Sequence, residues 1–330
     1  MTSPLAVALG DPAGIGPEIV AKAWELRRSA AIPPFFAIGR PAAVKAVWNG
    51  PIEIIGSPAD AEHCFPQALP MLQVGRPGVK ITPGQPCLEG ARNSLDALEM
   101  AVGLTRSGVA GALVTGPVSK TQLYSVGFTH PGQTEFIAER CGVSADTVAM
   151  MLVGPTLRTV PITSHLPYEE VPREISVERI VMKGRTVIRG LQRLFGIPRP
   201  HLAVAGLNPH AGENGALGRE EIDVINPAIE KLREEDFEVT GPYPPDAMFH
   251  ARMRQTYDAA LCMYHDQALI PLKTLHFDEG VNMTLGIPIV RTAPDHGTAF
   301  AIAGRSAADP GAMIAALQVA ASCAERFGQE

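Results

Sequence analysis

The sequence predicts an α/β protein built on a doubly wound, mainly parallel sheet. Short apolar runs recur along the 330 residues, and each is followed by a loop rich in Gly, Pro, Asp or Asn and then by an amphipathic stretch. The 32 glycines and 30 prolines indicate many short connections, and the hydrophobic fraction of 46% excludes a disordered chain. Because strand–helix–strand connections are right-handed, this alternation predicts a right-handed doubly wound sheet.

The apolar runs carry no charged residue, as expected of strands that are buried on both faces. We expect these strands at residues 5–9, 35–38, 112–115, 159–162, 202–205, 259–263 and 287–290. Between them, helical periodicity predicts helices at residues 19–26, 93–102, 177–195, 220–235 and 310–326.

The length and composition bound the class of protein. At roughly 150 residues per domain the chain predicts two domains, and it contains no long linker, so we expect crossing strands to join them. The net charge is −6 and the 28 Lys and Arg residues form no basic cluster, which argues against a nucleic-acid partner. The five dispersed cysteines contain no CxxC motif, so we expect reduced thiols and neither disulfides nor a thiolate zinc site.

No apolar run reaches the roughly eighteen residues that span a bilayer. The first residues lack the basic start and apolar core of a signal peptide. We therefore expect a cytoplasmic protein without membrane contact.

Three of the nine histidines follow the ends of expected strands, namely His165, His210 and His265. Ligands of open α/β sheets bind beyond the carboxyl ends of the strands, and three imidazoles hold a catalytic metal with one position open. We therefore predict a divalent metal on these side chains, although a single such histidine is more often a hydrogen-bonded surface residue. Asp266 either orients His265 or caps the following helix.

Two loops that connect strands to helices are candidate anion sites. Residues 10–18 place Pro17 early in a helix, but the glycine spacing does not match GxGxxG, and the chain has no P-loop motif, so a tight turn is the stronger interpretation. Residues 114–120 offer backbone N–H groups, Ser119 and Lys120 to an anion, and helix capping by Ser119 explains them equally well.

Lys273 and Arg291 carry positive charge that suits a phosphate or a carboxylate. Solvated surface charge is the alternative interpretation for each residue.

Seven motifs together resemble the 4-hydroxythreonine-4-phosphate dehydrogenase (PdxA) family of pyridoxal phosphate biosynthesis, over essentially the whole chain. The motifs lie at residues 10–18, 115–120, 163–167, 206–213, 263–267, 281–286 and 295–299. The resemblance implies a two-lobed α/β/α fold like that of isocitrate and isopropylmalate dehydrogenases, with the active site in the interdomain cleft. We expect a first lobe of residues 1–130 and 296–330 with part of the nucleotide site, and a second lobe of residues 131–295 with the metal ligands and dimer contacts.

The resemblance also implies roles for individual residues. One divalent metal (Zn, Mg, Mn or Co) is bound by His165, His210 and His265 and is shared between the two subunits of a homodimer. The small anionic substrate is bound by Gln133, Thr134, Lys273, Asn282 and Arg291. The cofactor, NAD or NADP, is bound by His296, Gly297, Thr298, Ala299 and Gly304. Lys273 and Asp266 are the candidate catalytic residues.

The implied reaction is metal-dependent, NAD(P)-linked oxidation of 4-phosphohydroxy-L-threonine to a β-keto acid that decarboxylates to 3-amino-2-oxopropyl phosphate. A divalent metal assists both halves, because it lowers the pKa of the substrate hydroxyl and takes up the charge that decarboxylation places on oxygen. Related family substrates are threonate or erythronate 4-phosphate and cis-dihydrodiol carboxylates such as terephthalate dihydrodiol. A metal-dependent hydrolase and a non-catalytic anion-binding protein are the alternatives outside this class.

The chain departs from the family at two positions. Gln133 replaces a histidine that contacts substrate, and an amide can neither carry a proton nor a positive charge. A lost charged hydrogen bond is worth on the order of 1.5–3 kcal/mol, so we expect measurable but weakened activity on 4-phosphohydroxy-L-threonine, which Gln133→His improves if the chain belongs to the vitamin B6 branch of the family. In the nucleotide loop, Ala301 replaces an acidic residue that is usual in the wider group of such dehydrogenases, which leaves the choice between NAD and NADP open.

Overall fold

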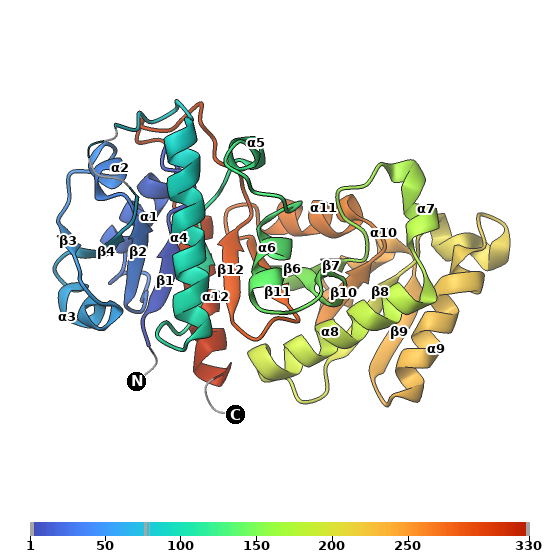
Figure 1. Ribbon diagram of the computed structural model, residues 1–330. Coiled ribbons are helices and arrows are strands. Elements are labelled where there is room, and N and C mark those ends of the chain that lie inside the picture. The colour runs from blue at the N-terminus through green and yellow to red at the C-terminus, as the bar shows by residue number, and fades with distance from the viewer. Residues whose placement is uncertain (1–2, 76–77, 79, 328–330) are drawn as a thin grey trace. The chain divides into compact units, whose positions relative to one another are not determined.

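The computed structural model describes residues 3–75, 78 and 80–327, and the chain forms two compact units (Figure 1). Unit 1 comprises residues 1–142 and 288–330, and unit 2 comprises residues 143–287. The sequence-based division instead places the boundaries after residues 130 and 295. The main chain passes between the units twice, so no single cut in the sequence separates them.

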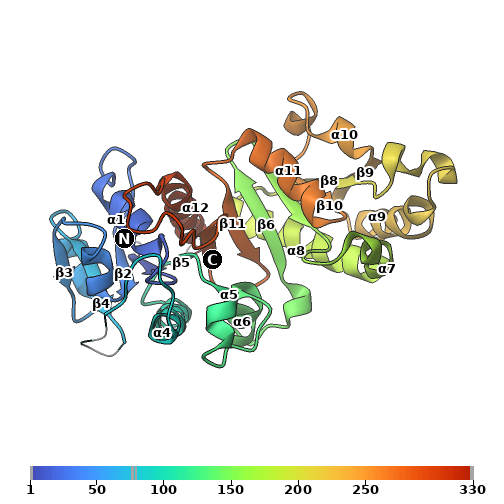
Figure 2. The same cartoon turned by 90° about the horizontal axis from the view of Figure 1, so that it is seen from above.

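Unit 1 contains a parallel sheet with the strand order β3-β4-β2-β1-β5-β12. In that order the strands are Ile52–Ile54, Leu69–Gln73, Phe35–Gly39, Leu5–Ala8, Leu113–Thr115 and Arg291–Pro294. Helix α4 (Leu88–Arg106) covers one face, and α1 (Gly16–Glu25) and α12 (Gly311–Phe327) cover the other (Figure 2). Every residue of β1, β2 and β5 is buried, which explains why these strands read as continuous apolar runs. Shorter helices of this unit are α2 (Pro41–Lys45), α3 (Ala61–Cys64), α5 (Lys120–Tyr124) and α6 (Gln133–Arg140).

Unit 2 contains a mixed sheet with the strand order β11-β6-β7-β10-β8-β9. In that order the strands are Val281–Leu285, Ala149–Gly154, Leu157–Pro161, Ala259–Cys262, His201–Ala205 and Glu238–Tyr243. The pairs from β7 to β9 are parallel, whereas β6 runs antiparallel to both β11 and β7. Helix α11 (His265–Leu275) packs on one face, and α8 (Val177–Phe195) and α9 (Asn226–Glu234) pack on the other (Figure 2). Shorter helices are α7 (Val171–Glu174) and α10 (Pro245–Met248).

Helix α8 shows how local sequence sets an element. The Ser176 hydroxyl accepts a hydrogen bond from the Arg179 backbone N–H at 3.2 Å and so caps the first turn. The helix ends at Gly196, whose φ of 67° is the left-handed conformation that favours glycine. Ile180, Val187 and Leu191 share its buried face. The predicted helix at residues 177–195 is confirmed.

Six of the seven predicted strands are confirmed and correspond to β1, β2, β5, β7, β8 and β10. The seventh is wrong. Residues 287–290 do not form a strand, because Gly286 with a φ of 86° ends β11 and Pro288 has no N–H to donate to a ladder. The chain bends there and resumes extended structure at Arg291, the first residue of β12. The antiparallel pairs of β6 are a second departure from the parallel sheet that the sequence predicts.

Two other features bear on the class of protein. None of the five cysteines, all within the described residues, forms a disulfide, and Cys64, Cys262 and Cys323 are buried. Along the part of the chain that the structure describes, no helix combines the length and the apolar character needed to cross a membrane.

Candidate functional site

Three neighbouring strands of unit 2 carry the candidate metal ligands at their carboxyl ends. The strands β7, β10 and β8 are adjacent and parallel, so their following loops leave the same edge of the sheet. His165 lies in the loop after β7, His265 begins α11 directly after β10, and His210 lies after β8 in the short segment η4 (Pro209–Gly215).

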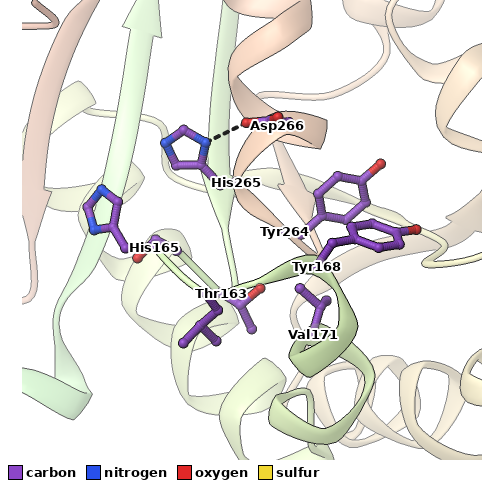
Figure 3. Close-up of a pocket in the computed structure, with 9 residues that line it drawn as sticks. Thr163, His165, Tyr168, Val171, Tyr264, His265 and Asp266 are labelled. Carbon is purple, nitrogen blue, oxygen red and sulfur yellow. Dashed lines mark hydrogen bonds and ion pairs between the residues drawn. The ribbon is translucent and has the colours of Figure 1, made fainter.

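His165 and His265 lie side by side (Figure 3). Their ring centroids are 5.6 Å apart and their planes meet at 42°. His165 has a φ of 57°, in the left-handed region that only a few per cent of residues other than glycine adopt. The structure therefore brings two of the three predicted ligands together within one chain.

Asp266 orients the imidazole of His265. The His265 Nδ1 and an Asp266 carboxylate oxygen are 2.7 Å apart, and because a carboxylate only accepts, Nδ1 is the donor. The lone pair of His265 is then on Nε2, as in metal sites where a carboxylate fixes the tautomer of a ligand. Tyr264, rather than Asp266, occupies the position before the first turn of α11, so the geometry favours orientation over helix capping.

A pocket of about 280 Å³ lies beside the histidine pair and has a polar end and an aromatic end. Both histidines and Asp266 line the polar end, and Tyr168 and Tyr264 line the other (Figure 3). The two tyrosine rings are in edge-on contact with centroids 5.3 Å apart. Burial raises the pKa of the Tyr264 phenol, and the neighbouring Tyr168 and Asp266 act in the same direction.

Lys273 lies near the candidate metal ligands. It shares a second pocket, of about 450 Å³, with His265 and Asp266. His265, Leu269 and Lys273 follow one another at intervals of four residues on α11 and so lie on one face of that helix. Lys273 is half-buried. Lys273 and His265 therefore line one pocket of unit 2, and the catalytic role of Lys273 stays a prediction.

Buried hydrogen bonds join the three histidine-bearing loops. The Thr163 hydroxyl donates to the Met263 carbonyl at 2.8 Å, which ties the loop after β7 to the loop after β10. Gln267 accepts from the Met263 backbone N–H at 2.6 Å and donates to the Gly206 carbonyl at 2.8 Å, which ties the loop after β10 to the loop after β8. Sequence reasoning gave Thr163 and Gln267 no role, although both lie in motifs that it singled out.

The His210 loop has an unusual backbone. Residues 210–214 all have positive φ, between 43° and 75°, and only Gly212 among them is a glycine. Left-handed backbone costs on the order of 1–2 kcal/mol for a residue such as Ala211 or Glu213, although asparagine adopts it more readily, so this segment is strained. The His210 side chain is 70% exposed and its Nδ1 is 3.4 Å from a Glu213 carboxylate oxygen.

The described residues contain no group of three or more His, Cys, Asp or Glu side chains that could hold a metal ion. Within the described residues His210 does not form such a group with His165 and His265, and its side chain lies exposed on a left-handed segment. All three histidines follow strands that end at the same edge of the sheet, two of them lie side by side within one chain, and the three-histidine metal site stays a prediction.

Unit 1 contains predicted substrate residues. Arg291 is buried, its Nη2 donates to the Thr115 hydroxyl at 2.8 Å, and burial lowers its pKa to about 10, so it stays charged at neutral pH. Gln133 and Thr134 begin α6. The Gln133 Nε2 donates weakly to the Gly116 carbonyl at 3.4 Å, which directs its Oε1 away from that carbonyl. This oxygen is buried and has no hydrogen-bond partner among the described residues.

Asn282 lies in unit 2, half-buried in β11 opposite Leu152 of β6. The predicted cofactor loop, residues 296–304, lies in unit 1 and packs on the first glycine-containing loop. The Ile15 backbone N–H donates to the Thr298 carbonyl at 3.0 Å. A Cβ on Gly14 would come within 2.9 Å of that carbonyl oxygen, so glycine permits this close approach.

The two candidate anion loops have structural explanations. Ser119 caps α5 by accepting from the Gln122 backbone N–H at 3.4 Å, as the capping interpretation predicted. Residues 10–18 make a tight turn that begins at Gly10 with a φ of 75° and leads into α1, which has Pro17 in its first turn. Asp11 accepts from the Ala13 N–H at 3.0 Å within this turn, and burial raises the pKa of its carboxyl.

These features define a two-unit α/β protein that presents a carboxylate-oriented histidine pair at the carboxyl edge of a sheet. The family model for the pyridoxal phosphate biosynthetic protein PdxA matches residues 33–320. The chain belongs to the PdxA family, as its motifs indicated.

Relatives and solved structures agree with this assignment. The chain is 56% identical over 321 residues to a 4-hydroxythreonine-4-phosphate dehydrogenase of Zymomonas mobilis, covering 97% of this chain and 96% of that one. The crystal structure of 4-hydroxythreonine-4-phosphate dehydrogenase from Klebsiella pneumoniae has a TM-score of 0.88 at 35% identity and 98% coverage of both chains. A terephthalate 1,2-cis-dihydrodiol dehydrogenase from Burkholderia xenovorans has a TM-score of 0.65 at 28% identity, covering 97% of this chain and 98% of that one. The α/β fold prediction is confirmed, and the chain is an oxidoreductase.

Proposed function

We propose that this enzyme oxidises 4-phosphohydroxy-L-threonine with NAD or NADP, in a metal-dependent reaction of pyridoxal phosphate biosynthesis. The product is a β-keto acid that loses CO2 to give 3-amino-2-oxopropyl phosphate. The full-length similarity to 4-hydroxythreonine-4-phosphate dehydrogenases supports the substrate. The observation that carries the metal requirement is the pair of His165 and His265, with Asp266 on Nδ1 of the latter.

The donor set fits a divalent cation such as Zn²⁺, Co²⁺, Mn²⁺ or Mg²⁺. Two neighbouring imidazoles, one of them oriented by a carboxylate, are typical of the ligands of such ions. When bound, the cation would lower the pKa of the substrate hydroxyl and stabilise the negative charge that develops on oxygen during decarboxylation.

We assign His210 as the third ligand, supplied by the second subunit of a homodimer. Its exposed side chain and its absence from the pair within the chain support a site that a second copy completes. Its Nδ1 faces Glu213, so Nε2 is directed away from that carboxylate.

The chain's own polar groups bind the substrate and handle its protons. Arg291, which stays charged at neutral pH, offers a bidentate donor to a phosphate or carboxylate, and Thr134 and Asn282 offer neutral hydrogen bonds. Lys273 lies in a pocket with His265, so its Nζ is the candidate to accept the hydroxyl proton. Residues 296–304 bind the nicotinamide cofactor.

A cis-dihydrodiol carboxylate is the second candidate substrate, and Gln133 is the observation that favours it. Its side chain is an uncharged amide, which attracts a phosphate less than a charged imidazole would, and its Oε1, without a hydrogen-bond partner among the described residues, is available to a hydroxyl donor. The dihydrodiol dehydrogenase at 28% identity shows that such a substrate occurs among structural neighbours.

Reduction of NAD or NADP, followed by near-ultraviolet absorbance, tests the proposal. The substrates are 4-phosphohydroxy-L-threonine, erythronate 4-phosphate and terephthalate dihydrodiol, each with and without a chelator. We expect turnover of the first that chelation abolishes and Zn²⁺ or Co²⁺ restores. Efficient turnover of the dihydrodiol alone would show that the substrate is a cis-dihydrodiol carboxylate and not 4-phosphohydroxy-L-threonine. Undiminished turnover after chelation would refute the metal requirement. We also propose that the enzyme is a homodimer, and light scattering at working concentration tests this oligomeric state. Its proposed location is the cytoplasm.

A further inference from the structure

The left-handed segment that carries His210 needs surrounding contacts to hold it. Four of the five residues in 210–214 are not glycine and still adopt left-handed backbone, which is costly for Ala211 and Glu213 above all. Such backbone persists only where the neighbouring structure over-determines it. The contacts that hold this segment therefore decide where His210 points.

A buried carboxylate next to the segment provides these contacts. Glu221 is 2% exposed and lies in η5 (Glu221–Ile225), a π-helical turn of a kind that often occurs at functional sites. One of its oxygens accepts from the Asn208 backbone N–H at 2.8 Å, and the other accepts from the Asn208 side-chain amide at 2.9 Å. Glu220 accepts from the same amide at 2.7 Å. Glu221 thus fixes both the backbone and the side chain of the residue two positions before His210.

Three glycines let the loop close around Glu221 and Asn208. A Cβ on Gly206 would lie 3.0 Å from a Glu221 oxygen, and one on Gly212 would lie 2.5 Å from the other oxygen. A Cβ on Gly218 would lie 2.3 Å from the Asn208 amide nitrogen. The loop backbone therefore packs closely against the side chains of Glu221 and Asn208, both before and after His210.

We propose that Glu221 is a positioning residue for the metal centre, acting through Asn208 to hold His210 in its ligand conformation. This inference rests on the proposed function, since it takes His210 as a metal ligand. The Glu221 carboxylate accepts two hydrogen bonds from Asn208, so we assign it a role that acts through Asn208 and not a place among the metal ligands. Glutamine at 221 keeps the size of the side chain but replaces one accepting oxygen with an NH2 group, which opposes a donor of Asn208.

The experiment measures Zn²⁺ affinity by competition with a chromophoric chelator, using the full-length protein. The variants are Glu221→Gln, His210→Ala and the double variant, and Glu234→Gln on the exposed surface of α9 is the matched control. Loss of a supporting contact typically weakens metal affinity about ten- to a hundredfold, and we expect this from Glu221→Gln. In the His210→Ala background the same change should have no further effect, because the ligand through which Glu221 acts is gone.

Far-ultraviolet circular dichroism checks that each variant is folded. If Glu221→Gln does not fold, Asn208→Ala replaces it. This change, at a half-buried position, removes the side-chain bonds to Glu220 and Glu221 and keeps the bond from the backbone N–H, and it should weaken Zn²⁺ binding in the same direction.

The outcomes separate this inference from the function on which it rests. If His210→Ala weakens Zn²⁺ binding but Glu221→Gln does not, the positioning role is wrong and the metal assignment stands. If Glu221→Gln weakens binding equally with and without His210, Glu221 has a general structural role and the inference is also wrong. If His210→Ala leaves the affinity unchanged, both the ligand assignment and the inference fail.

Discussion

Replacing Gln267 with methionine removes the two buried hydrogen bonds that join the loop after β10 to the loop after β8. The Met263 N–H and the Gly206 carbonyl then lose their partner in a region where Gln267 itself is 6% exposed. A buried polar group without a partner costs about 1–3 kcal/mol, and methionine fills nearly the same volume, so we expect little contribution from a cavity. The free energy of unfolding should therefore fall by about 2–6 kcal/mol for the two groups together.

Urea unfolding followed by far-ultraviolet circular dichroism measures this change. The two tryptophans, Trp24 and Trp48, both lie in unit 1, so tryptophan fluorescence would not report on Gln267 in unit 2. Gln318→Met is the matched control, because Gln318 is exposed and donates one hydrogen bond, to the Ala30 carbonyl at 2.7 Å. The control should lose less than about 1 kcal/mol. Equal losses in the two variants would refute the structural role given to Gln267.

Three further predictions concern single side chains. Burial raises the pKa of the folded Asp11 carboxyl above 3.8, so its ionisation at neutral pH costs stability, which is recovered as the pH falls through the folded-state pKa. Asp11→Asn should raise the urea midpoint at neutral pH, and the gain should shrink toward about pH 4; a pH-independent difference would argue against the burial effect. Gln133→His should improve kcat/KM for 4-phosphohydroxy-L-threonine by about ten- to a hundredfold, whereas no gain would remove Gln133 from phosphate recognition. Lys273→Met should lower kcat with Zn²⁺ affinity retained, and an unchanged pH profile of kcat would exclude Lys273 as the proton acceptor.

The central strands were predictable because strands that are buried on both faces consist almost entirely of apolar residues. All four residues of β1 and four of the five in β8 are buried, so each reads as an apolar run. Strand β11 was not predicted because Asn282 and Thr284 interrupt its apolar pattern. Helix α11 was not predicted because it contains Pro271, and proline normally ends a helix. These elements depend on tertiary contacts that override local preference.

For the site, the sequence predicted which residue types are present and which strands they follow, but not the local backbone or the hydrogen bonds that hold them. His165 and His265 could be paired because both follow strands of one parallel set. The left-handed backbone around His210 and the carboxylate of Glu221 beneath it left no signal, because they depend on contacts between residues 206–221 that no spacing rule describes. Gln267 stood in a recognisable motif, but its two hydrogen bonds appear only when the strands are aligned.

A mixture of two inactive variants tests most directly whether one metal site is built from two copies of the chain. His165→Ala and His210→Ala each remove a ligand, so each variant alone should be inactive in the NAD reduction assay. On unfolding and refolding together, half of the dimers should contain one of each, and each such dimer has one intact site, so about a quarter of the wild-type activity should return. If all three histidines came from the same chain, no mixture would regain activity, and that result would contradict the shared metal centre.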